Sequence, residues 1–180
     1  MSKNRYHPIS VALHWTIFLL IVVAFASIEI RGYLPSGNQA RPLLRSTHVL
    51  VGQLIFVLAV LRVAARFGLG APPALGNRRW QTWAVHGGHI FLYGALLLQP
   101  LMGLLFMQTG GRDVALLGWT LPTLIAPDVE LESNLKDAHK LFGTAIYFLI
   151  AGHVLAAYWH QYVLKEECLS RMAISRGKRG

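Results

Sequence analysis

Four long apolar segments dominate this sequence, and each is close to the length of a membrane-spanning helix. They cover roughly residues 9–28, 47–65, 84–107 and 138–163. A helix needs about 20 apolar residues to cross the roughly 30 Å hydrocarbon core of a bilayer. Backbone polar groups in lipid must be hydrogen-bonded within the chain, so helices are the expected spanning form. We therefore predict an all-α fold, an integral membrane four-helix bundle that forms a single domain over residues 1–180.

The charged residues support this class and predict an orientation. Only 14% of the residues are charged, whereas soluble domains carry about 25%. Cytoplasmic segments of membrane proteins are enriched in Lys and Arg, so we predict that both termini are cytoplasmic. The net charge of +9 then reflects topology, and no nucleic-acid partner is expected. The side of the termini would hold Lys3, Arg5, Arg62, Arg66, Arg78, Arg79, Lys165, Arg171, Arg176, Lys178 and Arg179, and the other side Arg31, Arg41, Arg45, Arg112, Lys136 and Lys140.

The connection between the third and fourth segments contains a further apolar stretch, VALLGWTLPTLI (114–125). It is too short to span a bilayer as a helix, and it contains a proline. We predict that it lies at the membrane surface or folds over the helix ends.

Histidines are the polar residues that stand out within the apolar segments. Ionisable residues inside a membrane are costly and usually serve a function. A single histidine could be a neutral imidazole hydrogen-bonded between helices, but this explanation is weak for seven together. The seven that lie in or beside the segments are His14, His48, His86, His89, His139, His153 and His160.

The spacing of His139 and His153 in the fourth segment indicates two metal centres. Fourteen helical residues turn the chain to within about 40° of four full turns and advance it by about 21 Å. The two imidazoles therefore lie on nearly one face at two depths. Imidazole is a common axial ligand of haem iron, and helix bundles build such sites from facing helices.

Each of these histidines needs a partner at matching depth on another helix. His48, at the outer start of the second segment, suits His139, and His14, in the inner half of the first, suits His153. Gly52 follows His48 by one helical turn, as Gly143 follows His139, so each glycine shares its ligand's face. Such glycines would give clearance for a flat porphyrin, although close helix packing explains a glycine equally well.

Haem is favoured over a bare metal ion at these positions. The set contains no nearby carboxylate or thiolate to complete a tetrahedral zinc site. There is no C-x-x-C-H motif for covalent c-type attachment, and the single cysteine, Cys168, leaves no disulfide framework.

The ordered set of motifs resembles the bacterial cytochrome b-561 family, in particular its di-haem superoxide oxidases. The resemblance covers essentially the whole chain, and the four-helix layout is also similar to the b-type subunits of membrane formate dehydrogenases and hydrogenases. It implies two haem b groups, held by His14 with His153 and by His48 with His139, in a multi-pass protein of the bacterial inner (plasma) membrane. The motifs are His14-Trp15, Arg45-x-x-His48, His86-x-x-His89 and Leu135-Lys136-x-x-His139 with His153.

The resemblance implies an oxidoreductase that transfers electrons from two superoxide anions to ubiquinone, with membrane lipid around it. The alternative is a haem b subunit that relays electrons between quinone and a partner dehydrogenase or hydrogenase. His86, His89 and His160 could contact haem propionates, hydrogen-bond a quinone head group or carry protons. His86 or His89 could also replace His14 as the inner ligand.

Basic residues flank the two outer histidines. Arg45 and Lys136 each lie three residues before a ligand and so share its helix face, and Lys140 adds a further positive charge. Such a patch can attract an anionic substrate. The same charges could instead pair with haem propionates or lipid phosphates.

Overall fold

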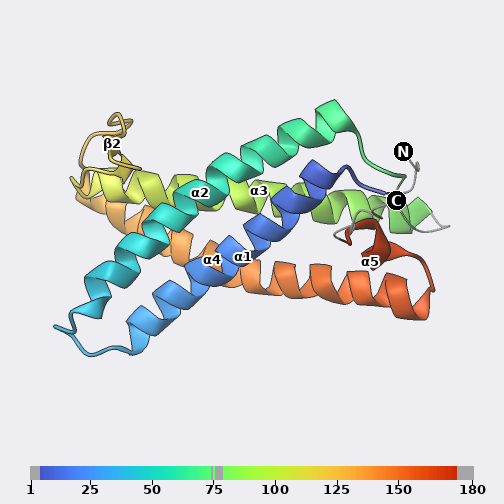
Figure 1. The fold of residues 1–180 in the computed structure, drawn as a ribbon. Coiled ribbons are helices and arrows are strands. Elements are labelled where there is room, and N and C mark those ends of the chain that lie inside the picture. Colours follow the sequence, from blue (N-terminus) through green and yellow to red (C-terminus); the bar gives the residue numbers. More distant parts are fainter. Residues whose placement is uncertain (1–4, 74, 76–78, 174–180) are drawn as a thin grey trace, which may run out of the picture.

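Four long helices make up most of the computed structural model, which describes residues 5–73, 75 and 79–173 (Figure 1). They are α1 (Pro8–Tyr33), α2 (Ala40–Leu69), α3 (Arg79–Thr109) and α4 (Val129–Tyr158). All four are long and apolar enough to cross a membrane, which confirms the predicted all-α membrane fold. Two short strands, β1 (Ala115–Leu116) and β2 (Trp119–Thr120), a π-helical turn, η1 (Trp159–Val163), and a short helix, α5 (Cys168–Arg171), are also present.

The helices differ from the predicted segments mainly at their ends. α2 and α4 begin well before the predicted residues 47 and 138, because hydropathy marks the limits of apolar sequence and not the limits of helix. The start of α4 shows the local cause: the Asp128 carboxylate accepts a hydrogen bond from the Leu131 amide at 2.9 Å. The negative charges of Glu130 and Glu132 in the first turn interact favourably with the positive end of the helix dipole.

The four helices form two antiparallel hairpins, α1 with α2 and α3 with α4, and α2 also packs against α3. Figure 1 shows the first hairpin crossing the second at an angle. The buried core lies between α1 and α2 and consists of Ile17, Ala24, Val51 and Ile55. The most apolar windows of α3 and α4 bury no residues, so their apolar side chains are available to lipid.

The two ends of the bundle carry different connections. At the end we call the terminal end, α5 packs back on the start of the chain: the Trp15 indole donates to the Met172 carbonyl at 2.9 Å, and the Tyr6 amide to the Arg171 carbonyl at 3.3 Å. The opposite end, the hairpin end, holds the turn between α1 and α2 and the strands β1 and β2 (Figure 1).

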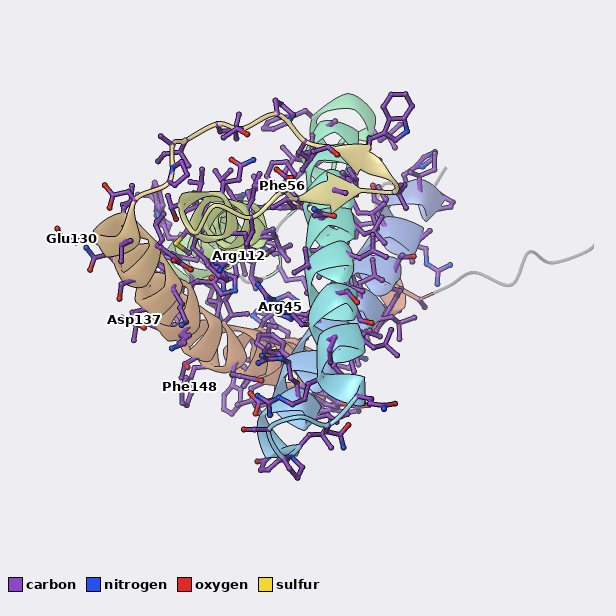
Figure 2. The ribbon with its side chains drawn as sticks, turned by 90° about the vertical axis from the view of Figure 1, so that its left-hand side faces the viewer. Arg45, Phe56, Arg112, Glu130, Asp137 and Phe148 are labelled. Atoms are coloured by element: carbon purple, nitrogen blue, oxygen red, sulfur yellow. The ribbon has the colours of Figure 1, made fainter. Side chains whose placement is uncertain are left out.

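The stretch 114–125, predicted to lie at the membrane surface or over the helix ends, contains a β-hairpin. It does not form a membrane-spanning helix. β1 and β2 pair antiparallel through a turn in which Leu117 and Gly118 have φ of 50° and 88°. The buried Gln108 of α3 holds the following segment, donating to the Pro122 carbonyl at 2.9 Å and accepting from the Leu124 amide at 3.0 Å. In the view along the bundle, the β-hairpin stands in front of α2 (Figure 2).

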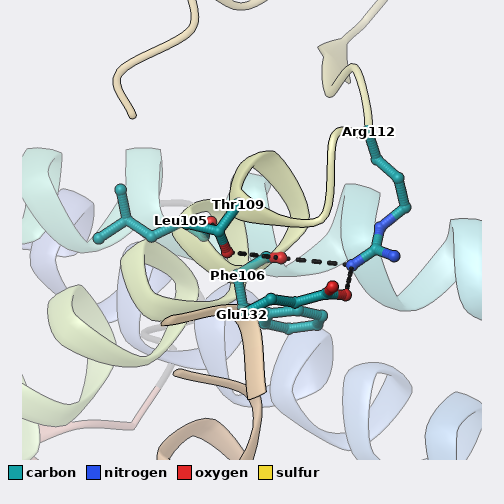
Figure 3. Close-up of polar contacts among 5 residues, drawn as sticks. All are labelled: Leu105, Phe106, Thr109, Arg112 and Glu132. Carbon is teal, nitrogen blue, oxygen red and sulfur yellow. Dashed lines mark hydrogen bonds and ion pairs between the residues drawn. The ribbon is translucent and has the colours of Figure 1, made fainter. Parts of the chain in front are cut away.

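An ion pair ties the end of α3 to the start of α4 (Figure 3). Arg112 Nη2 lies 2.6 Å from Glu132 Oε1 and donates to the Phe106 carbonyl at 3.2 Å. Thr109 donates its hydroxyl to the carbonyls of Leu105 and Phe106, which closes the last turn of α3. Gly110 provides the space for the pair, since a Cβ there would lie 2.6 Å from the Glu132 oxygen.

We predict that Gly110→Ala lowers the stability of the protein. The added methyl group displaces the Arg112–Glu132 pair, and because the displaced atoms are the ends of two flexible side chains, the cost is that of a partly exposed ion pair, at most about 1 kcal/mol. Thermal unfolding of the detergent-solubilised variant should show a lower Tm. Gly32→Ala is the matched control, because no atom lies within 4 Å of the Cβ position at this helical glycine. An unchanged Tm for Gly110→Ala would contradict the prediction.

Candidate functional site

Two pairs of histidines face each other at different depths of the bundle. At the hairpin end, the ring centroids of His48 (α2) and His139 (α4) are 6.2 Å apart and the ring planes meet at 85°. Nearer the terminal end, the centroids of His14 (α1) and His153 (α4) are also 6.2 Å apart, with planes at 68°. Imidazole nitrogens bind zinc at about 2.0–2.1 Å, and a metal held at such distances between two imidazoles keeps the ring centroids roughly 6 Å apart. Both pairs therefore have the spacing of two ligands on opposite sides of one metal.

Hydrogen bonds orient both rings of the hairpin-end pair. His48 Nδ1 lies 2.8 Å from the Ala24 carbonyl of α1, and His139 Nδ1 lies 3.1 Å from the Gln99 carbonyl of α3. A carbonyl accepts only a protonated nitrogen, so each Nδ1 carries the proton. The Nε2 lone pairs are then free for a metal, as is usual for metal-binding histidines.

Three residues of α3 that sequence reasoning missed fix the position of His139. The Gln99 side chain donates to the His139 carbonyl at 2.8 Å, so Gln99 holds both the ring and the backbone of this histidine. Gly103 makes room for the ring, since a Cβ there would lie 3.1 Å from Cε1. The Phe106 ring packs beside it with centroids 5.5 Å apart. The sequence signal of this arrangement is the four-residue spacing of Gln99 and Gly103, which places both residues on one face of α3.

A third histidine, His89 of α3, lies at the terminal-end pair. Its ring centroid is 5.9 Å from that of His153, and its Nδ1 lies 2.6 Å from the Val85 carbonyl. His153 therefore has two possible partners, His14 and His89, as the sequence analysis left open.

The spacing of the helices favours His14. α4 packs extensively against α3 along the described chain, whereas its backbone makes few contacts with α1 or α2. A porphyrin lying between two ligands needs separated helices. His14 and His48 are on α1 and α2, the helices that leave this separation from α4, whereas His89 is on the adjoining α3.

His86 and His160 lie outside both pairs. His86 is exposed, and its Nδ1 lies 2.7 Å from the Thr82 carbonyl of its own helix. His160 lies in the π-helical turn η1, and its Nδ1 is 2.5 Å from Glu166 Oε2. Its side chain is largely buried beside the Glu166 carboxylate, so these two groups can share a proton at the terminal end.

The two predicted glycines have different surroundings. No atom lies within 4 Å of the Cβ position of Gly52, one turn after His48, so an added methyl group would meet no neighbour there. Gly143 instead faces the Gln99 side chain, whose Nε2 would lie 3.2 Å from an added Cβ. Clearance for a porphyrin at either glycine stays a prediction.

A wide groove of about 780 Å³ opens at the hairpin end beside His48. Its wall includes Thr47 and Val49, the chain neighbours of His48. Three arginines line it: the predicted Arg45, and Arg31 and Arg41, which sequence reasoning did not assign to the site. Asp113 is the acidic residue in its wall. Figure 2 places Arg45 toward the centre of the bundle.

Lys136 and Lys140 are exposed on α4 and do not line this groove. The Lys140 ammonium lies 3.4 Å from the Asp137 carboxylate, and both side chains are more than 60% exposed. Figure 2 shows Asp137 on the outer side of α4. The structure therefore separates these two lysines from Arg45 and offsets the charge of Lys140.

The histidine pairs do not extend into larger ligand sets. Among the residues that the structure describes, no three His, Cys, Asp or Glu side chains converge as they would around a zinc ion. Paired imidazoles across a membrane helix bundle instead match the axial ligands of haem iron. A helix bundle of this kind defines the class of membrane-bound b-type cytochromes.

Comparison with known families gives the particular family. The family described as prokaryotic cytochrome b561 matches residues 5–173, and the chain belongs to it. It is accordingly a multi-pass inner-membrane haem protein of electron transport, with haem b as the cofactor that the family implies.

Three relatives cover nearly the whole chain. "Cytochrome b561 homolog 1" of Escherichia coli is 32% identical over 94% of this chain and 97% of its own length. "Probable superoxide oxidase CybB" of Yersinia pestis is 30% identical over 94% of this chain and 96% of its own. "Cytochrome b562" of Cereibacter sphaeroides is 30% identical over 95% of this chain and 96% of its own length.

Proposed function

We propose that this cytochrome is a superoxide oxidase, which oxidises superoxide on the outer side of the membrane and transfers the electrons to ubiquinone. Two superoxide anions each lose one electron and leave as oxygen, and ubiquinone takes up two electrons and two protons to become ubiquinol. When bound, two b-type haems, one at each histidine pair, supply the one-electron carriers for this stoichiometry. The name of the Yersinia pestis relative supports the proposal.

One observation carries the proposal: the wall of an arginine-lined groove contains Thr47 and Val49, the chain neighbours of His48, which belongs to one of the two imidazole pairs. Arg31, Arg41 and Arg45 attract a small anion to the wall that contains the neighbours of His48. His48 and His139 hold a haem at this level, and His14 and His153 hold the second nearer the terminal end. In this proposal Arg45, Lys136 and Lys140 assist the oxidation by attracting superoxide.

The terminal end is the proposed side of the quinone. His86, His89 and His160 lie toward this end, and His160 shares a hydrogen bond with Glu166 from which a proton can be passed on. We propose that these histidines contact the quinone head group or the propionates, or carry the protons that quinone reduction consumes.

We further propose that the terminal end faces the cytoplasm. The eleven-to-six distribution of Lys and Arg supports this orientation. Five of the eleven lie outside the described residues, namely Lys3, Arg78, Arg176, Lys178 and Arg179.

The alternative function is electron relay between quinone and a partner dehydrogenase or hydrogenase. It requires the same histidine pairs and differs in the electron donor. Purification separates the two: a lone chain that reduces quinone with superoxide supports the oxidase, and a stable complex with a peripheral dehydrogenase supports the relay.

A direct test adds superoxide to the purified cytochrome under anaerobic conditions. Pulses of potassium superoxide should reduce the haem bands, and ubiquinone added next should re-oxidise them. Superoxide dismutase in the same cuvette should abolish the reduction. Haem bands that stay oxidised with superoxide, but are reduced by a quinol, would exclude the oxidase.

We predict that the outer basic residues accelerate the reaction with superoxide by long-range attraction. Exposed charges act over about 8 Å at physiological salt, so Arg45→Gln should slow haem reduction by superoxide about two- to fivefold at low ionic strength. It should also flatten the dependence of the rate on salt. Lys136→Gln and Lys140→Gln should have smaller effects, because neither lysine lines the groove.

Arg79→Gln is the matched control for this series, since Arg79 is an exposed arginine at the terminal end. Reduction by a neutral quinol measures the contribution of haem binding. If a variant loses haem and its reduction by superoxide and by the quinol slows equally, the substituted residue holds the cofactor. The prediction that this residue attracts superoxide would then be wrong.

A further inference from the structure

A small cavity at the terminal end is lined by side chains that donate hydrogen bonds. It lies between the start of α1, the last turns of α2 and the middle of α3, and its volume is about 10 Å³. Its polar side chains are all donors, and none is acidic: Tyr6, Ser10, Arg62, Arg66 and Tyr93. The Ser10 hydroxyl is buried and has no hydrogen-bond partner.

The two arginines of this cavity lie beside the terminal-end histidines. Arg62 donates to the Ser10 carbonyl at 2.8 Å, which leaves further guanidinium N–H groups available. Its charge is close enough to act on the imidazoles of His14 and His153. Arg66, one turn further along α2, is within electrostatic range of His89.

No carboxylate of the described chain balances these two charges. The ion pairs among the described residues are Arg112–Glu132, Lys140–Asp137 and His160–Glu166. Of the eight acidic residues, six lie toward the hairpin end. The two at the terminal end are Glu166 and Glu167. Arg62 and Arg66 are partly exposed and lack a counter-charge from the described chain, so they can bind an anion from outside the chain.

We propose that Arg62 and Arg66 form a carboxylate-binding site that receives a propionate of the haem held by His14 and His153. The cavity of about 10 Å³ beside the buried Ser10 hydroxyl has room for one water at most, so the carboxylate binds against the guanidinium groups that border the cavity. Arginine is suited to this role because its planar N–H groups match the two oxygens of a carboxylate. The site rests on the proposed second haem. It extends that proposal by assigning residues that bind the propionate groups of the haem, in addition to the histidines that bind its iron.

The proposal is tested by removing either partner of the contact. The chain is produced in haem-deficient cells and loaded in membranes with haem or with haem dimethyl ester, which has no carboxylates. With haem, Arg62→Gln and Arg66→Gln should each speed the loss of the terminal-end haem to excess apomyoglobin roughly tenfold, the effect of losing a charge-assisted hydrogen bond. Arg62→Lys should restore part of the retention.

With the dimethyl ester, the wild-type chain should lose the cofactor as fast as Arg62→Gln loses haem. Arg62→Gln should not increase the rate at which the ester is lost. Arg79→Gln, the exposed control, should retain both cofactors normally. Redox titration gives an independent signature: Arg62→Gln should lower the midpoint potential of the terminal-end haem, because a nearby positive charge favours the reduced iron.

Equal acceleration by Arg62→Gln with both cofactors would overturn the proposal and indicate another anion, such as a lipid phosphate or free phosphate. The haem content of the wild-type chain separates this failure from that of the proposed function. A chain that binds two haems but shows no ester effect lacks only the carboxylate site, whereas a chain that binds one haem contradicts the second histidine pair itself.

Discussion

Replacing His139 with alanine is expected to remove one of the two proposed haems from the protein. In the proposed arrangement this imidazole would supply one of the two axial ligands of that haem, with His48, 6.2 Å away between ring centroids, supplying the other. His48→Ala should have the same effect, and His153→Ala should remove the second haem instead. Extraction of haem from the purified variants, measured as the pyridine haemochrome, gives the number of haems per chain.

Two further variants decide the partner of His153. If His14 is the ligand, His14→Ala removes the terminal-end haem and His89→Ala keeps it, in line with the separation of α1 from α4. Full retention of both haems in His14→Ala would move the ligand to α3, because His89 is the other ring near His153. His86→Ala is the matched control, since this exposed histidine lies in neither pair.

Superoxide is expected to reduce the cytochrome from one side of the membrane only. The anion crosses lipid poorly, and the arginine groove lies at the hairpin end. Xanthine oxidase outside right-side-out vesicles should therefore reduce the haem bands, and the same enzyme outside inverted vesicles should not. Dithionite, which should reduce every vesicle preparation after detergent is added, gives the total amount of cytochrome.

The opposite result in this experiment is equally informative. Reduction from inverted vesicles alone would place the hairpin end in the cytoplasm and contradict the orientation inferred from Lys and Arg. Equal reduction from both sides would contradict the groove as the place where superoxide reacts.

The positions of the histidines could be predicted because helical geometry alone determines them. His139 and His153 share one helix, so their common face and their separation in depth follow from the pitch. The structure then brings His48 and His14 to these two rings, and metal binding at the pairs stays a prediction. By contrast, the choice between His14 and His89 depends on which helices separate, which no single helix encodes.

The surroundings of the histidines could not be predicted, because they depend on how the hairpins cross. Gln99 and Gly103 contact His139 only because α3 packs against α4 at that level. Arg31, near the end of α1, joins Arg41 and Arg45 of α2 because the turn between the two helices brings it there, although it lies 17 residues before His48 in the sequence. Lys136 and Lys140 are close to His139 along α4, and the structure nevertheless places them outside the groove.

The division into two helical hairpins has a consequence for the biogenesis of the protein. Each hairpin contains the contacts that its two helices need, whereas the proposed cofactor ligands on α4 are shared with α1 and α2 of the first hairpin. The hairpins can therefore enter the membrane one after the other during synthesis, before any haem is present. The proposed haems would then add a second connection between the hairpins, beside the packing of α2 against α3, so haem supply is expected to affect how firmly the two hairpins hold together.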